Sequence, residues 1–185
     1  REAEDLIRRL RELVRRHHEL NRKLAEELRK LSEENKRKIE KVTREVEKLV
    51  KDVADTLKDD RGDERLERLV KELKDRLDEL VKEIERSTRE VERRMREVLK
   101  RSRDSAREVE ERVERLLEEV RRRVRDKDKL KRLEEELERL KEEVRKSNRD
   151  LEKEVRDLRK ENEKVTEEVK KRIEDLKRKL DEDRR

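Results

Sequence analysis

Aliphatic residues recur along nearly the whole chain with the spacing of one face of an α-helix. When successive residues are turned by about 100°, the aliphatic side chains of residues 2–59, 63–125 and 128–182 fall into three arcs, each about 100–140° wide. Only two short stretches, LKDDRGDER and RDKDKL, interrupt the pattern. The pattern therefore predicts three long helices, joined by loops at about residues 59–63 and 125–128.

The apolar pattern repeats after about 18 residues, which is five turns of an ideal helix. Leu6, Leu24 and Val42 form one such series. A seven-residue repeat would wind the helices into a left-handed supercoil, whereas this repeat predicts straight, essentially untwisted helices. Because such short loops place consecutive helices side by side, neighbouring helices should run antiparallel. The predicted fold class is all-α: a monomeric, antiparallel, up-down-up three-helix bundle that forms a single domain over residues 1–185.

The composition favours long helices and limits the chemistry. Charged residues make up 64% of the chain, which contains one glycine and no proline, cysteine or aromatic residue. Gly62 is predicted to stop the first helix, and either Asp126 or Asp128 is predicted to cap the third.

The lack of cysteine excludes disulfides and thiolate metal sites. No run approaches the roughly 20 apolar residues of a membrane-spanning helix. No targeting signal is predicted, so the compartment is left open, with recombinant cytoplasmic expression as the expectation.

The two signs of charge alternate along every predicted helix, which is typical of a solvent-exposed face. The net charge is +6, and the cluster of Arg121, Arg122 and Arg123 is of a kind that attracts nucleic acid. However, the chain has no aromatic residue to stack on bases. We therefore expect a solvated charged surface that binds neither nucleic acid nor a membrane, with no required partner and no cofactor.

Uncharged polar residues lie within the apolar arcs rather than on the charged faces. When the helices are threaded up, down and up, position i of the first meets about position 122 − i of the second and about i + 131 of the third. Two buried polar layers then emerge, and hydrogen bonds should join the members of each, because an unpaired buried polar group is costly. A shifted register would set Asn or His against Leu, so the layers should specify one register. Layer one consists of His17, Asn21, Ser102, Ser105, Ser147 and Asn148, and layer two of Ser32, Asn35, Ser87, Thr88, Asn162 and Thr166.

His17 and His18 are the only histidines, and they raise the question of a reactive site. Two metal ligands on one helix face need i, i+4 spacing, whereas adjacent side chains point about 100° apart, so no metal site is predicted. A Ser–His hydrolase using His17 with Ser102 or Ser105 would lack an inward carboxylate and an oxyanion hole, so no catalytic residue is predicted. We expect His17 within layer one and His18 at the solvent boundary. Burial should lower the pKa of His17, which makes pH-dependent stability a hypothesis to test.

Several features together resemble a known family: the 18-residue repeat in all three segments, Gly62 in a short loop, the matched polar layers, and charged stretches such as RLEEELERLKEEVRK. The chain is similar to de novo designed, parametric, untwisted three-helix bundles with buried hydrogen-bond networks. This resemblance covers the whole chain and carries no catalytic residue. It implies an idealised, thermostable, monomeric structural scaffold that is not an enzyme. One departure is that neither loop contains proline or a run of glycine and serine.

Two alternative functions are left open. One is a helical interaction module that accepts a further helix or self-associates, and its only hint is the wider arc of the first segment near Ile7, Leu20, Thr43 and Thr56. The other is a natural spectrin-like coiled-coil spacer, although such repeats would be expected to carry aromatic core residues. The scaffold is favoured over both, because no second apolar stripe remains outside the arcs.

Overall fold

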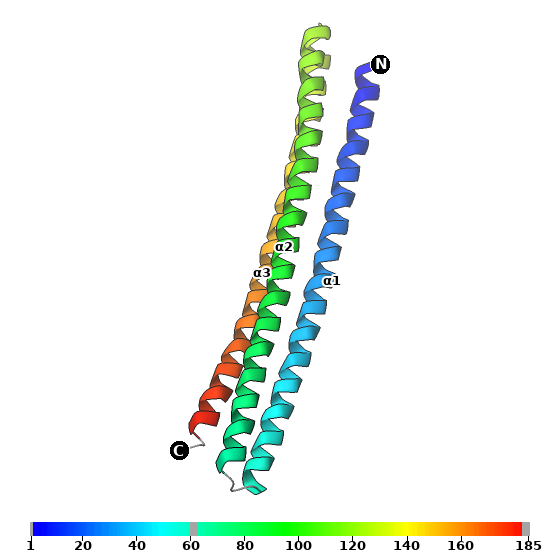
Figure 1. Ribbon diagram of the computed structural model, residues 1–185. Coiled ribbons are helices and arrows are strands. Elements are labelled where there is room, and N and C mark those ends of the chain that lie inside the picture. Colours follow the sequence, from blue (N-terminus) through cyan, green and yellow to red (C-terminus); the bar gives the residue numbers. More distant parts are fainter. Residues whose placement is uncertain (1, 60–62, 183–185) are drawn as a thin grey trace. The chain divides into compact units, whose positions relative to one another are not determined.

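Three α-helices make up the computed structural model, which describes residues 2–59 and 63–182 (Figure 1). They are α1 (Glu2–Asp59), α2 (Asp63–Arg123) and α3 (Lys127–Glu182). The predicted ends differ slightly, since α2 was expected to reach about residue 125 and α3 to begin at about 128. No strand occurs within the described ranges. The predicted all-α fold class with three helices is therefore confirmed.

The short connection between α2 and α3 shows how a helix is started without proline or glycine. The Oδ1 atom of Asp126 accepts a hydrogen bond from the backbone N–H of Asp128 at 3.1 Å. The Asp126 carbonyl accepts one from the backbone N–H of Leu130 at 3.0 Å. Asp126, rather than Asp128, is therefore the cap of α3. The predicted stop at Gly62 lies outside the described residues.

Contacts between the helices divide the described residues into two compact units. Unit 1 comprises those within Arg1–Arg29 and Arg94–Asp157, and unit 2 those within Lys30–Arg93 and Leu158–Arg185. Each unit contains a segment of every helix and an aliphatic cluster of its own, the first including Val113 and Leu137 and the second Leu77 and Leu80. The single domain over residues 1–185 stays a prediction.

In unit 1, the order of cross-helix ion pairs gives the directions of the helices. Partners on α2 and α3 run in opposite order along the two helices, so these helices are antiparallel, as in Glu110–Arg145, Glu114–Lys141 and Arg121–Glu134. Partners on α1 and α3 advance together, so these helices are parallel, as in Arg11–Glu136 and Arg29–Glu154.

Unit 2 has the same helix directions. Antiparallel order holds between α2 and α3, as in Asp78–Lys177 and Glu85–Lys170, and parallel order between α1 and α3, as in Lys36–Glu161 and Glu47–Arg172. The predicted up-down-up arrangement is therefore present within each unit.

Candidate functional site

Layer one lies wholly in unit 1 and receives two residues from each helix. His17 and Asn21 are one turn apart on the inner face of α1, where i, i+4 spacing places side chains one above the other. His17 and Ser102 are each only 2% exposed, and Asn21 and Ser147 are also buried. Ser105 and Asn148 are half-buried. Aliphatic residues flank the layer along each helix, so its polar atoms depend mainly on one another for hydrogen bonds.

The imidazole of His17 links α1 to both other helices. Its Nδ1 atom lies 2.8 Å from Ser105 Oγ on α2, and its Nε2 atom lies 2.7 Å from Asn148 Oδ1 on α3. Because an amide oxygen only accepts, Nε2 carries the proton and donates to Asn148, and the Ser105 hydroxyl donates to Nδ1. One neutral tautomer therefore satisfies both contacts.

Burial lowers the pKa of His17 below its ordinary value of 6.5, with a smaller lowering from His18. The hydrogen bond with Asn148 and the nearby carboxylate of Glu110 act in the opposite direction. The neutral form that the hydrogen bonds require is thus also the form that burial favours.

Asn21 is the second centre of layer one. Its Nδ2 atom donates to Ser147 Oγ at 2.9 Å and to Asn148 Oδ1 at 3.0 Å. Its Oδ1 atom accepts a hydrogen bond from the Ser102 hydroxyl at 2.7 Å. Asn148 Oδ1 accepts from both His17 and Asn21, and the Ser102 hydroxyl also lies 3.0 Å from this oxygen. All six layer-one residues belong to one connected network.

His18 also contacts this network, which the sequence did not indicate. Its side chain is exposed, as expected for the solvent boundary, yet its Nδ1 atom lies 3.3 Å from Ser147 Oγ. Ser147 accepts from Asn21, so its hydroxyl hydrogen is available to donate to His18. The 100° turn between adjacent residues moves His18 away from the core but leaves it within reach of α3.

Layer two lies wholly in unit 2, and its hydrogen bonds form two separate groups. In the first, the Ser87 hydroxyl donates to Asn35 Oδ1, and Asn35 Nδ2 donates to Asn162 Oδ1 at 2.6 Å. In the second, the hydroxyls of Thr88 and Thr166 are 3.0 Å apart. The threading had paired Asn35 with Thr166. The same threading placed Asn162 close by, and Asn35 forms its hydrogen bond with Asn162, one turn earlier on α3 than Thr166.

Two buried polar atoms of layer two have no hydrogen-bond partner among the described residues. They are Ser32 Oγ and Asn162 Nδ2. Ser32 was predicted to belong to this layer, and the structure places it in unit 2 without joining it to either group. Both unpaired atoms belong to unit 2, so layer two is the less completely satisfied layer.

Ser105, His17 and Asn148 are hydrogen-bonded in the order hydroxyl, imidazole and amide. Asn148 therefore orients the imidazole, a role for which the sequence had suggested no inward carboxylate. The second requirement of a hydrolase is a set of free N–H donors for the oxyanion. Ser105 lies far from either end of α2, where backbone N–H groups are bonded within the helix. The geometry therefore supports a structural network better than acyl transfer. Among the described residues, no three His, Cys, Asp or Glu side chains gather in a group that could hold a metal ion.

The wider arc of α1 does not produce an apolar surface. The Thr43 and Thr56 hydroxyls donate to the carbonyls of Ile39 and Asp52, each one turn earlier. Over the part of the chain that the structure describes, no large hydrophobic side chain is exposed. None of the described helices is long and apolar enough to cross a membrane.

One buried charge was not anticipated. The Lys141 side chain is 10% exposed, and its ammonium group pairs with Glu114 of α2 and with Glu138 one turn earlier on α3. Lysine buries its methylene stem while its charged head reaches the edge of the interface. Lys141 directly follows the core residue Leu140, which is the only signal in the sequence that could have indicated its burial.

No protein-family model and no curated protein matches this chain. A solved structure described as a computationally designed three helix bundle is similar to it, with 22% sequence identity and a TM-score of 0.44. The match covers 98% of this chain and 85% of that one. The three-helix fold rests on the helices and contacts described above rather than on this likeness.

Proposed function

We propose that the protein is a designed structural scaffold with no natural biochemical activity, in which the two polar layers specify how the helices pair. The observation that carries this proposal is layer one itself, where His17 and Asn21 bond to residues of both other helices. Aliphatic contacts are not directional and tolerate a shift by one turn, whereas a shift in register would separate these donors from their acceptors and leave buried polar atoms unpaired.

The regularity of the surface supports a designed origin. Cross-helix ion pairs recur at the spacing of the apolar repeat, with Arg11, Arg29 and Glu47 of α1 each paired to α3. Such repetition of charged contacts on the outer face is not needed for folding, because exposed ion pairs contribute only about 0–1 kcal/mol each. Such repetition is instead expected when the same pattern of charged residues is assigned deliberately to each repeat of a helix.

The same arrangement supports a monomeric state as part of this proposal. Without exposed large hydrophobic residues in the described ranges, the chain offers little apolar area for self-association. An interaction module that accepts a further helix would need such an apolar stripe along one helix. We therefore place the monomeric scaffold ahead of that module.

The proposal can be tested by replacing layer one entirely with aliphatic residues of similar size. We expect the free energy of unfolding to be unchanged or raised, because an apolar core often replaces a buried polar one without loss. We also expect the specificity of pairing to fall. Sedimentation should give one species near 23.0 kDa for the parent and a mixture of species for the variant.

The matched control exchanges six exposed lysines for arginine, and it should sediment as the parent does. If the aliphatic variant remains one monomeric species with a single set of methyl resonances, the layers do not specify the pairing. If the parent itself sediments as a dimer or larger, the monomeric scaffold is wrong and the self-associating module is favoured.

A further inference from the structure

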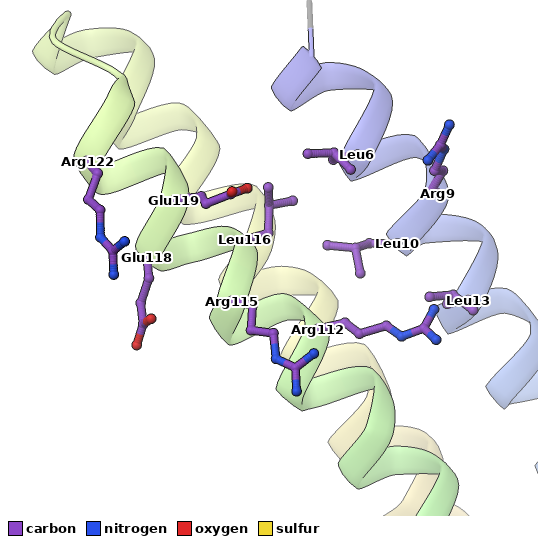
Figure 2. Close-up of a pocket in the computed structure, with 10 residues that line it drawn as sticks. All are labelled: Leu6, Arg9, Leu10, Leu13, Arg112, Arg115, Leu116, Glu118, Glu119 and Arg122. Carbon is purple, nitrogen blue, oxygen red and sulfur yellow. The ribbon is translucent and has the colours of Figure 1, made fainter.

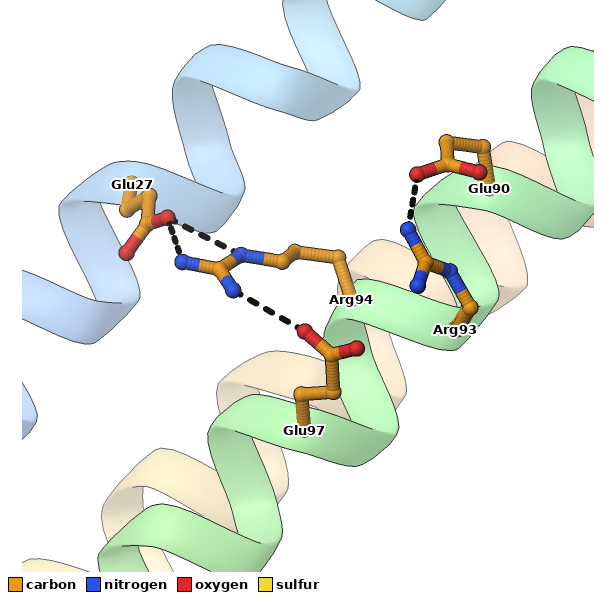
Figure 3. Close-up of polar contacts among 5 residues, drawn as sticks. All are labelled: Glu27, Glu90, Arg93, Arg94 and Glu97. Carbon is orange, nitrogen blue, oxygen red and sulfur yellow. Dashed lines mark hydrogen bonds and ion pairs between the residues drawn. The ribbon is translucent and has the colours of Figure 1, made fainter.

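A cluster of one arginine between two glutamates joins α1 to α2 in unit 1. Arg94 of α2 donates from Nε to Glu27 of α1 at 3.0 Å and from Nη1 to Glu97 at 2.9 Å (Figure 3). All three side chains lie on the outer edge of the α1–α2 interface. The two carboxylates compensate the charge of the arginine and join the two helices at their exposed edge.

The same cluster occurs in unit 2, displaced by about 18 residues along each helix, which is one repeat. Arg76 of α2 donates from Nη2 to Glu45 of α1 at 2.7 Å and from Nη1 to Glu79 at 3.0 Å. Two units thus cover the α1–α2 seam in the same way, with a Glu–Arg–Glu arrangement at equivalent positions.

The next repeat, toward the start of α1 and the end of α2, breaks this rule. The residues equivalent to Glu27, Arg94 and Glu97 are Arg9, Arg112 and Arg115. Both glutamates are replaced by arginine, and all three arginines are exposed. Arg112 pairs with Glu108 of its own helix at 3.4 Å. Within the described ranges, no ion pair involves Arg9 or Arg115, so positive charge accumulates there without a cross-helix counterion.

A groove lies beside these arginines, between α1 and α2 in unit 1. It has a volume of about 530 Å³, and its apolar floor is formed by Leu6, Leu10, Leu13 and Leu116. Leu6 and Leu10 point from α1 toward α2, and Arg112 extends from α2 to beside Leu13 (Figure 2). The rim carries four arginines and two glutamates, and one of these, Glu119, is paired with Arg123 at 3.7 Å. The groove therefore combines an apolar floor with a net positive rim.

We propose that this groove binds a single-chain alkyl carboxylate, with its alkyl chain on the leucines and its carboxylate among Arg9, Arg112 and Arg115. The carboxylate takes the place of the glutamates that the other two repeats supply. Arginine suits this role because its planar guanidinium forms paired hydrogen bonds with a carboxylate. The volume lies in the range of about 300–1,000 Å³ that is typical of small-ligand sites. A partner helix would need apolar anchors exposed along several turns, and no large hydrophobic residue is exposed in the described ranges, where the groove leucines are buried or half-buried.

The test is calorimetric titration of the full chain with decanoate, at low ionic strength and below the concentration at which decanoate self-associates. Two further probes separate the contributions: butyrate has the charge without the long chain, and decyltrimethylammonium has the chain with the opposite charge. The groove variant is Arg9→Glu with Arg115→Glu, which restores the glutamates of the repeat. The matched control is Arg37→Glu with Arg156→Glu, which changes two exposed arginines elsewhere and has the same net charge.

We expect saturable binding of one decanoate per chain, with both comparison probes weaker by about tenfold or more. The groove variant should lose about tenfold or more in affinity, and the control should bind as the parent does. A milder variant, Arg9→Gln with Arg115→Gln, should lie between them, and circular dichroism verifies that each variant is folded. The proposal is overturned if decanoate shows no saturable binding, if the control loses as much affinity as the groove variant, or if decyltrimethylammonium binds as tightly.

Discussion

Layer one in unit 1 and layer two in unit 2 contain the same number of polar residues, yet their hydrogen bonding differs. In layer one, six side chains from three helices belong to one network. In layer two, the bonds separate into an Asn35 group and a threonine pair, and two buried atoms are left without a partner. Equal polar content at a matched height is therefore not sufficient for complete hydrogen bonding.

The two layers differ in how many α1 side chains bond to both other helices. The imidazole of His17 has hydrogen-bonding atoms on two edges, so it reaches Ser105 on α2 and Asn148 on α3 at once. Asn21 also bonds to both of these helices, whereas in layer two Asn35 is the only described α1 residue that bonds to each. Thr88 and Thr166 satisfy each other, but neither reaches the amides. Layer one is one network because His17 and Asn21 each bond to both other helices and share Asn148 as an acceptor.

The largest expected effect comes from removing the central asparagine of each layer. Asn21→Leu eliminates the bonds to Ser147, Asn148 and Ser102, and should lower the free energy of unfolding by about 2–4 kcal/mol. Asn35→Leu removes only the bonds to Asn162 and Ser87, and should cost about 1–2 kcal/mol. Guanidinium unfolding followed by circular dichroism measures both. Equal losses, or a larger loss for Asn35→Leu, would show that connectivity does not determine the stability of a layer.

The arrangement of the helices follows from the sequence, because three apolar arcs and two short connections leave little freedom. The threading that matched His17 with Ser105 and Asn148 relied only on this order, and both contacts are present. Helical periodicity predicts how far along its helix a residue lies and which face of the helix it occupies. These two properties brought together the predicted partners of His17, whereas Ser32 was predicted for layer two and has no hydrogen-bond partner among the described residues.

Partner choice within a layer could not be predicted in the same way. Residues 162 and 166 lie on one face of α3, so periodicity does not decide which of them Asn35 meets. The decision depends on side-chain length and rotamer, which also explains why Ser32 lies at the right height without a partner and why the exposed His18 reaches Ser147. Lys141 is a similar case, since its burial depends on the path of its stem rather than on the angle of its Cβ.

An intermediate effect, of opposite sign in the two layers, is expected from removing one serine hydroxyl. Ser105→Ala deprives the Nδ1 atom of His17 of its donor and should lower the free energy of unfolding by about 1–2 kcal/mol. Ser32→Ala removes a buried hydroxyl that has no hydrogen-bond partner among the described residues, and it should raise the free energy of unfolding by about 1 kcal/mol. The two variants are controls for each other, since each makes the same chemical change. A loss of stability in Ser32→Ala would mean that its hydroxyl has a partner in solution.

The smallest effect is a pH dependence confined to layer one, because both histidines belong to unit 1. Burial lowers the pKa of His17 in the folded state below its ordinary value of 6.5. As pH falls through that value, the unfolded chain takes up a proton before the folded chain does, so the free energy of unfolding decreases. The contribution of neutral His17 to the free energy of unfolding is complete above pH 6.5 and is lost as the pH approaches the lower folded pKa.

Denaturant melts at about pH 7.5 and pH 5 should therefore show a larger loss of stability for the parent than for His17→Asn. Asn35→Leu, altered only in layer two, should keep the pH dependence of the parent. If His17→Asn and the parent lose the same stability, the titration of His17 is not coupled to folding, and the two layers differ only in their connectivity.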